Sequence, residues 1–491
     1  MPNEHHSVSR NAKWAIAQTL ISACVLFFLY RFLLQELGAA KLGLWSLVLA
    51  STSLARLGEL GFSSATLRFV GKYLGANQPK DAAEILETAV LSISLPFLVL
   101  AAIAIPLIGV MLPWFVPSQH MGDALVIIPW AMLSLWLGVT GGLVQSAIDG
   151  CGRMDLRNMV LIGTSLLYLA IAVMLAPLLG LKGVAIAQAV QAGASLMIMW
   201  WLAKANINSL NWFPWRWQKH RFKEIASFAV TMQAGSIAGM FVEPLTKAYI
   251  SRFGGLEFLA FFDMANQVIT RARSVLVSGF QAITPQFALT NNPSKHRELF
   301  LQSQNKVLDL GIPFMAVVMM GFPFLSEIWV GHKEPIFIIS GQIIGATWVL
   351  VTLMTPAYFF LTGTGRGYPV AAAQIITLIG TALFGWVGGM SYSQFGPIIG
   401  AAIALLIGNI YAYKTVWVIL FSKASELAAP KWIATRFLKS GVTYALIVSI
   451  NILASSYLTT RWEYLTVLTL LLATIAYLVF DNLRKQNIST R

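Results

Sequence analysis

The sequence is poor in charged residues. Asp, Glu, Lys and Arg make up only 11% of the 491 residues, whereas a soluble domain carries about a quarter. Hydrophobic residues make up 57%, and the mean hydropathy is +0.71. A soluble chain of this composition would lack the polar side chains needed to cover its surface. The composition therefore predicts a polytopic membrane protein.

The sequence also lacks the common signatures of enzymes and metal sites. Its two cysteines, Cys24 and Cys151, have no metal-ligand spacing, and its six histidines form no ligand cluster. The strings GxxxxGK[ST], HExxH and GxSxG are absent, which argues against an ATPase and against two hydrolase classes. The loops are short throughout, whereas membrane glycosyltransferases usually need large ones. We expect a transporter without cofactor or metal, and no enzyme.

Long apolar runs are what the sequence has instead. A spanning helix needs about 20 mostly apolar residues, and about 14 stretches have that length. The predicted spans are 14–35, 43–67, 85–111, 123–147, 158–179, 183–203, 226–250, 257–285, 305–326, 336–362, 368–390, 397–420, 437–458 and 463–481. The first lacks the form of a cleaved signal peptide, so we expect it to be retained.

The basic residues predict the orientation of these spans. Lys and Arg exceed Asp and Glu by 34 to 20. Most loop cations fall in alternate loops, which cytoplasmic placement explains without nucleic-acid binding. The loops predicted outside hold only Lys41, Lys182, Arg252, Lys333 and Arg461. We expect both termini in the cytoplasm.

Three pairs of short strings suggest an internal repeat. "DGCGR" at 149–153 returns as "TGTGR" at 362–366, and "GVAIA" at 183–187 returns as "GAAIA" at 400–404. "LGAAKLGLW" at 37–45 has a looser echo, "FGGLEFLAF", at 253–261. Shifts of 213, 217 and 216 residues predict two six-helix lobes in parallel orientation, at 1–210 and 226–422. Residues 423–491 are predicted to add two helices and a cytoplasmic tail.

The predicted linker at 211–225 contains "NWFPWRWQKHRF", in which Trp and Phe alternate with Arg, Lys and His. This composition is typical of a membrane-interface anchor. Two interpretations remain: a linker that lies on the inner leaflet, or a contact with acidic lipid headgroups.

Charges inside predicted spans are costly in lipid, at about 2.5–3.5 kcal/mol each on insertion scales. Pairs three or four residues apart share a helix face: Arg56 with Glu59, and Glu243 with Lys247. Five cations against three acids favour an anionic substrate group. The candidate substrate-binding residues are Arg31, Arg56, Lys247, Arg271 and Arg273. The candidate coupling or gating residues are Glu59, Glu243 and Asp263. Structural ion pairs, or snorkelling of Arg31 and Lys247 to an interface, are the alternatives.

With these features the chain resembles the multidrug/oligosaccharidyl-lipid/polysaccharide flippase superfamily, and within it the Wzx-type O-antigen flippases. The resemblance rests on "LGAAKLGLWSLVLASTSLARLGELGFSSATLRFVGKYLG", on the stretch from "FVEPLTKAYI" to "ITPQFA", and on the "GCGR" and "GTGR" turns. It implies two six-helix lobes in a V, plus two helices. It also implies alternating-access transport of a polyprenyl-pyrophosphate-linked oligosaccharide for lipopolysaccharide or another polysaccharide. Cavity cations would then hold the pyrophosphate.

Further expectations follow from this resemblance and from the buried charges. A proton or a sodium ion is the candidate coupling ion. The expected partners are the lipid-linked oligosaccharide, membrane lipids, and polysaccharide polymerase and chain-length machinery, without nucleic acid. Two other functions stay open: a cation exporter of the multidrug and toxin extrusion family, and a membrane scaffold for glycan-assembly enzymes.

Overall fold

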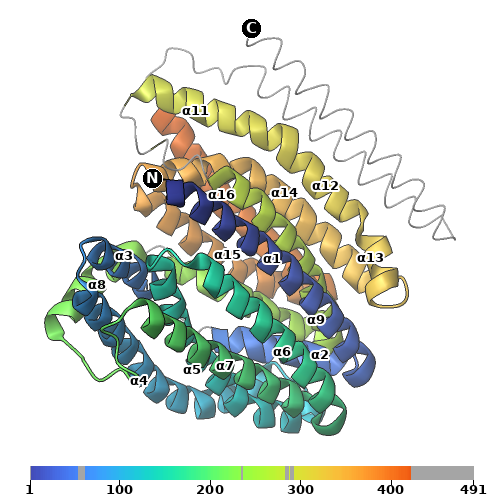
Figure 1. Cartoon of the computed structure of the whole chain (residues 1–491). Helices are drawn as coiled ribbons and strands as arrows, with labels where there is room; N and C mark the ends of the chain where they lie inside the picture. The colour runs from blue at the N-terminus through green and yellow to red at the C-terminus, as the bar shows by residue number, and fades with distance from the viewer. Residues whose placement is uncertain (1, 54–60, 234–235, 282–286, 288–291, 422–491) are drawn as a thin grey trace. The chain divides into compact units, whose positions relative to one another are not determined.

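The computed structural model describes residues 2–53, 61–233, 236–281, 287 and 292–421. Within these ranges all regular structure is helical (Figure 1). The chain contacts divide into two units, 1–260 and 261–491, and the boundary falls inside one long helix. The predicted spans at 437–458 and 463–481 lie outside the described residues, as do Arg56 and Glu59.

Nine α-helices begin among the described residues of the first unit. They are α1 (Pro2–Leu37), α2 (Ala39–Ser53), α3 (Phe62–Gly75), α4 (Pro79–Met111), α5 (Met121–Gly150), α6 (Met154–Leu179), α7 (Leu181–Asn206), α8 (Lys219–Gln233) and α9 (Ser236–Gln281). The helix α5 packs against α2, α3, α4 and α7, and α6 packs between α1 and α7. The short α8 lies against α3 and the start of α4 (Figure 1).

The second unit continues from the end of α9. Its further described helices are α11 (Pro293–Lys306), α12 (Ile312–Met320), α13 (Phe322–Trp329), α14 (Pro335–Gly363), α15 (Gly367–Tyr392) and α16 (Gly396–Phe421). A π-helical segment, Val307–Gly311, joins α11 to α12. The helices α15 and α16 form a tight antiparallel pair, and α14 packs against α16 and α12.

Eight of the described helices are long and apolar enough to cross a membrane. A ninth is added if the run Pro293–Met320 and α13, which meet at a bend of 42°, form one span. These nine correspond to nine predicted spans. The protein is therefore an all-helical polytopic membrane protein.

The remaining predicted spans within the described residues differ from the structure at glycines. The run 43–67 is not one helix, because Gly61 has φ 77° and α3 begins at Phe62. Conversely, residues 236–250 of the run 226–250 and residues 257–281 of the run 257–285 lie in one helix, α9, with a break at Gly255 (φ 84°, ψ 173°). Only glycine adopts such positive φ values without strain, so each glycine sets a helix boundary that hydropathy alone misses.

The two repeat turns have the same backbone structure. Gly152 and Gly365 have φ values of 73° and 72°. The amides of Arg153 and Arg366 donate to the carbonyls five residues earlier, at 3.2 and 2.8 Å. This is the Schellman arrangement that ends a helix at a left-handed glycine, and it recurs at the shift of 213 residues. The repeated strings thus encode the same helix end in both units.

Candidate functional site

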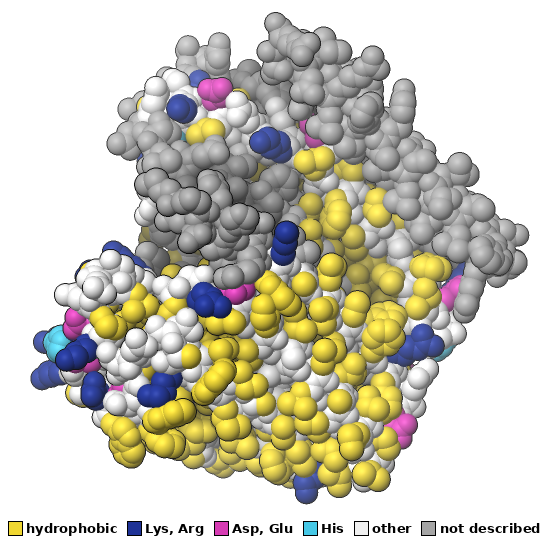
Figure 2. Space-filling model, in the orientation of Figure 1, with side chains coloured by type: hydrophobic (Ala, Val, Ile, Leu, Met, Phe, Trp, Pro, Cys, Tyr) yellow, Lys and Arg dark blue, Asp and Glu magenta, His cyan; other side chains and the backbone are white. Residues whose placement is uncertain are grey.

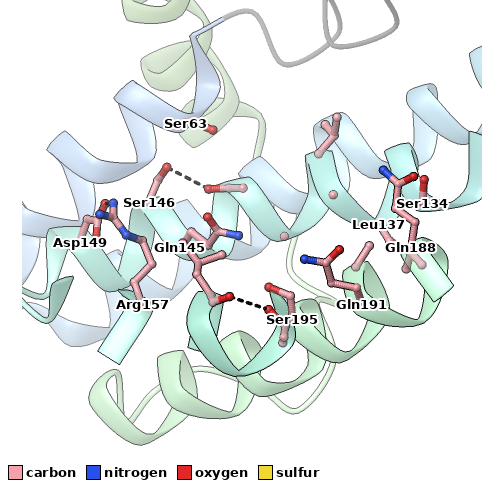
Figure 3. A pocket seen from close by; sticks show the side chains of 17 residues that line it. Ser63, Ser134, Leu137, Gln145, Ser146, Asp149, Arg157, Gln188, Gln191 and Ser195 are labelled. Carbon is pink, nitrogen blue, oxygen red and sulfur yellow. Dashed lines mark hydrogen bonds and ion pairs between the residues drawn. The ribbon is translucent and has the colours of Figure 1, made fainter. Parts of the chain in front are cut away.

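A polar cavity of about 480 Å³ lies within the first unit (Figure 3). Side chains from α3, α5, α6 and α7 line it, and most of them are uncharged and polar. The polar lining residues are Ser63, Ser134, Gln145, Ser146, Asp149, Arg157, Thr164, Gln188, Gln191 and Ser195.

The helix α7 supplies one polar stripe of this cavity. Gln188, Gln191 and Ser195 are spaced by three and four residues, so they share one face of the helix. The rest of α7 is largely apolar and packs on α5 and α6. Opposite this stripe, Gly138, Gly141 and Gly142 line the cavity from α5. They leave open the volume that larger side chains would fill.

Two buried polar atoms of this stripe have no hydrogen-bond partner within the described residues. They are Oε1 of Gln188 and Oγ of Ser195. Buried polar groups are nearly always hydrogen-bonded in folded proteins, and an unmade bond costs about 1–3 kcal/mol. Both residues line the cavity, so a hydroxyl-rich ligand or water there would satisfy them.

An ion pair lies at one end of the cavity. Asp149 and Arg157 form an ion pair between the ends of α5 and α6. Arg157 also donates from Nη2 to the side-chain oxygen of Asn158 at 3.2 Å. Figure 3 shows the pair at one end and Ser134 with Gln188 at the other. Because the acid and base neutralise each other, the lining carries little net charge.

The predicted charged residues lie elsewhere, and none of the six that are described lines this cavity. In the first unit, Lys247 is buried and its Nζ lies 3.0 Å from Oε1 of Glu243. The predicted pair on one helix face is therefore present. Arg31 is partly buried on α1.

The second unit holds the other three. Asp263 is buried, with 1% of its surface exposed. Arg271 is exposed, whereas the Arg273 guanidinium stacks on the Trp348 ring at 4.0 Å. Cation–π stacking of this kind holds a cation within the protein without an acidic partner. The cavity in which the resemblance places the five cations stays a prediction.

The predicted site residues are all charged, so they do not include the glutamines of this cavity. A usable signal was present: Gln188 and Gln191 interrupt an apolar helix three residues apart, near its middle. Neutral amides have a smaller cost in a membrane helix than charges, but buried ones still require partners. Gln145, four residues before Asp149 on α5, belongs to the same pattern.

Two family models match the chain. One, described as a polysaccharide biosynthesis protein, matches residues 131–333, and the model of the MatE family matches residues 15–174. A search of curated proteins found no match.

Solved structures share the fold at low identity. The lipid II flippase MurJ, in an inward closed conformation, is 13% identical with a TM-score of 0.67, over 97% of this chain and 99% of its own. An inward-facing multidrug resistance MATE transporter is 14% identical with a TM-score of 0.66, over 83% and 100%. A transporter from Pyrococcus furiosus, described as having a binding pocket of reverse polarity, is 16% identical with a TM-score of 0.58, over 85% and 96%.

The spanning helices, the polar cavity between them and these matches define a multi-pass membrane transporter. The prediction of a multi-pass membrane transporter is confirmed at this level. Two family models match parts of the chain, and solved transporters of the multidrug/oligosaccharidyl-lipid/polysaccharide superfamily share its fold, in agreement with the resemblance.

Proposed function

We propose that this protein is a flippase for a polyprenyl-pyrophosphate-linked oligosaccharide. It moves this polysaccharide precursor from the cytoplasmic to the outer leaflet of a bacterial inner membrane by alternating access. One observation carries the proposal. The polysaccharide biosynthesis model matches residues 131–333, and every residue that lines the polar cavity except Ser63 lies in that range.

The chemistry of the cavity supports a glycan as cargo. Amides and hydroxyls both donate and accept hydrogen bonds, so they match sugar hydroxyls. The volume of about 480 Å³ lies within the usual range of small-molecule sites, about 300–1,000 Å³. A cationic drug would favour an acidic lining, but the acid here, Asp149, is already paired with Arg157. We assign the neutral sugar end of the cargo to this cavity.

The pyrophosphate end requires cations outside this cavity. We retain Arg31, Arg56, Lys247, Arg271 and Arg273 as the residues proposed to contact it, since guanidinium and ammonium groups bind phosphate oxygens well. An inside-negative potential favours outward movement of an anion by about 2.3 kcal/mol per charge per 100 mV. Proton or sodium coupling is assigned to Glu59, Glu243 and Asp263.

We also propose the arrangement of the spans. The protein has 14 spans, arranged as lobes at 1–210 and 226–422, the linker at 211–225 and two further helices at 423–491, with both termini cytoplasmic. The nine described spans and the repeated helix ends at Gly152 and Gly365 support it. Polymerase and chain-length machinery are the proposed partners, and O-antigen is the proposed product class.

Mass spectrometry of lipids from cells that lack the protein tests this function. We expect polyprenyl-pyrophosphate oligosaccharide to accumulate, and its mass then identifies the cargo. Re-expression of the wild-type chain should remove the accumulated lipid. In cells without a second flippase, an unchanged lipid profile contradicts the proposal.

The MatE match at residues 15–174 and the fold of the MATE structures favour a second candidate, cation export. Cells lacking the protein would then become sensitive to cationic drugs without accumulating lipid-linked glycan. The two measurements on the same strain separate the candidates.

A further inference from the structure

The irregular segment between α7 and α8 is held in one position by a buried carboxylate. Glu87 on α4 has no exposed surface. Its Oε1 accepts hydrogen bonds from the backbone and side-chain amides of Asn211, at 3.2 and 2.9 Å. Its Oε2 accepts from the backbone amides of Trp215 and Arg216, at 3.2 and 2.9 Å. Charge-assisted bonds to backbone amides are among the strongest in proteins, so this segment is fixed on α4.

The neighbouring residues of α4 extend this attachment. The Thr88 hydroxyl accepts from the amide of Gln218 at 3.3 Å. One turn further along α4, Ser92 accepts from the Trp217 indole at 2.9 Å. The segment therefore runs along α4 rather than leaving the protein, although Pro214 prevents it from forming a helix.

The segment turns its aromatic rings outward. Trp212, Phe213, Trp215 and Trp217 have exposed fractions of 62, 66, 76 and 49%. Adjacent α4 residues beyond Ser92 are also apolar and exposed, among them Leu95 and Val99 at 59 and 60%. An apolar helix face that begins where the exposed rings end is the arrangement expected at the boundary between lipid headgroups and hydrocarbon.

The charges beside these rings are positive. Arg216, Lys219, His220 and Lys223 are exposed. Figure 2 shows Lys, Arg and His side chains gathered next to hydrophobic ones at the left of the view, where Figure 1 places α8. Exposed cations at 216–223 therefore lie beside the exposed rings at 212–217.

The acidic residues nearby are paired with Arg221, a buried cation. Arg221 is buried and forms ion pairs with Asp81, Glu84 and Glu224. Tyr73 donates to Glu224 at 2.9 Å, and burial together with that bond raises the pKa of the Tyr73 hydroxyl, which stays protonated. Lys72 lies 3.7 Å from the same carboxylate. The exposed charge of the segment is therefore positive.

We propose that residues 211–223 form a binding site for anionic phospholipid. The aromatic rings lie among the acyl chains just below the headgroups, and the exposed cations contact the phosphate groups. Charge complementarity selects acidic over zwitterionic lipid. The buried Glu87 holds the rings in place before lipid binds, which reduces the entropy lost on binding. This inference does not depend on the cargo.

Native mass spectrometry of the purified full-length chain tests the charge preference, with phosphatidylglycerol and phosphatidylcholine as probes. We expect the wild-type chain to bind phosphatidylglycerol more tightly, less so at high salt. The triple variant R216Q/K219Q/K223Q should lose affinity for phosphatidylglycerol by at least about tenfold. The control triple K182Q/K295Q/K306Q removes three other exposed cations and should change it little. Equal loss in both variants, or no lipid preference in the wild type, overturns the proposal.

A depth measurement tests the placement of the rings. Bimane is attached to W215C in a chain that carries C24S and C151S, reconstituted into phosphatidylglycerol vesicles. Phospholipids brominated near the headgroup should quench it more than those brominated near the chain end. Absence of quenching by either lipid contradicts the proposal, even where the charge variants fold poorly.

Discussion

Lys247 and Glu243 form an ion pair across one turn of α9, and the two ends of the pair lie in different environments. The Lys247 side chain is 6% exposed, whereas that of Glu243 is 59% exposed, at an Nζ–Oε1 distance of 3.0 Å. Pro244, inside the same turn, removes one backbone hydrogen bond. A buried ammonium group is thus paired with a carboxylate that is largely exposed.

This asymmetry predicts that Glu243→Gln destabilises the protein. Removing one member of a buried ion pair typically costs about 3–5 kcal/mol, and the exposure of Glu243 reduces the expected loss to about 1–3 kcal/mol. The double variant E243Q/K247M should recover most of the stability, because it removes the buried charge as well. Thermal unfolding of the purified variants measures both effects. Additive losses in the double variant would show that the pair is not coupled.

Substitution of the cavity residue Gln188 should leave stability intact but reduce transport. Gln188→Leu removes a buried oxygen that has no partner among the described residues, so stability should stay unchanged or rise by up to about 1 kcal/mol. Transport should fall by at least about tenfold, because the leucine cannot bind a sugar hydroxyl. Reconstituted flipping assays and thermal unfolding give the two readouts.

A matched control distinguishes the cavity from glutamine in general. Gln342 on α14 also has a buried Oε1 without a partner among the described residues, but its Nε2 donates to the Met319 carbonyl at 3.0 Å. Gln342→Leu should therefore lower the unfolding temperature while leaving cargo binding intact. If Gln188→Leu destabilises equally and flips normally, the cavity has only a structural role.

The segment that carries the exposed aromatic rings predicts a proteolysis result. Glu87→Ala removes the acceptor of four hydrogen bonds, so residues 211–216 should open far more often. We expect trypsin to cut after Arg216 at least about tenfold faster than in the wild-type chain. The exposed Glu36 offers the control Glu36→Ala, which should leave the cutting rate unchanged. Equal rates in the wild type and Glu87→Ala would refute the role of Glu87.

Hydropathy predicted the spans because the cost of burying polar groups in lipid acts on every residue of a helix. It failed at Gly61 and Gly255, where a single backbone conformation decides the boundary. Residue spacing predicted the Glu243–Lys247 pair correctly, because spacing along one helix determines that contact. The polar cavity depends on contacts between α5, α6 and α7, so no single helix reveals it. Glu87 was equally hidden, because its partners lie more than 120 residues away.

Close helix packing predicts which glycines resist substitution. A Cβ at Gly183 would clash with the Leu175 carbonyl of α6, and one at Gly400 would clash with the Phe384 carbonyl of α15. Each substitution to alanine should cost about 1–3 kcal/mol, because backbone must move. Gly163, inside α6, has open space around it, so Gly163→Ala should be neutral or stabilising by up to about 1 kcal/mol. Thermal unfolding of the three variants checks this contrast, which equal losses would contradict.

The Cys151 thiol lies in the turn after α5. Burial raises its pKa to about 11, although Arg153 acts in the opposite direction. Only the thiolate reacts with iodoacetamide, so at neutral pH the reactive fraction should be roughly a hundredfold or more below that of an ordinary thiol with a pKa of about 8.5. In a C24S chain, the alkylation rate should rise about tenfold per pH unit from pH 7 to 10. The same chain unfolded in detergent should level off above about pH 9. A folded chain that levels off at the same pH would show that the turn does not shield Cys151.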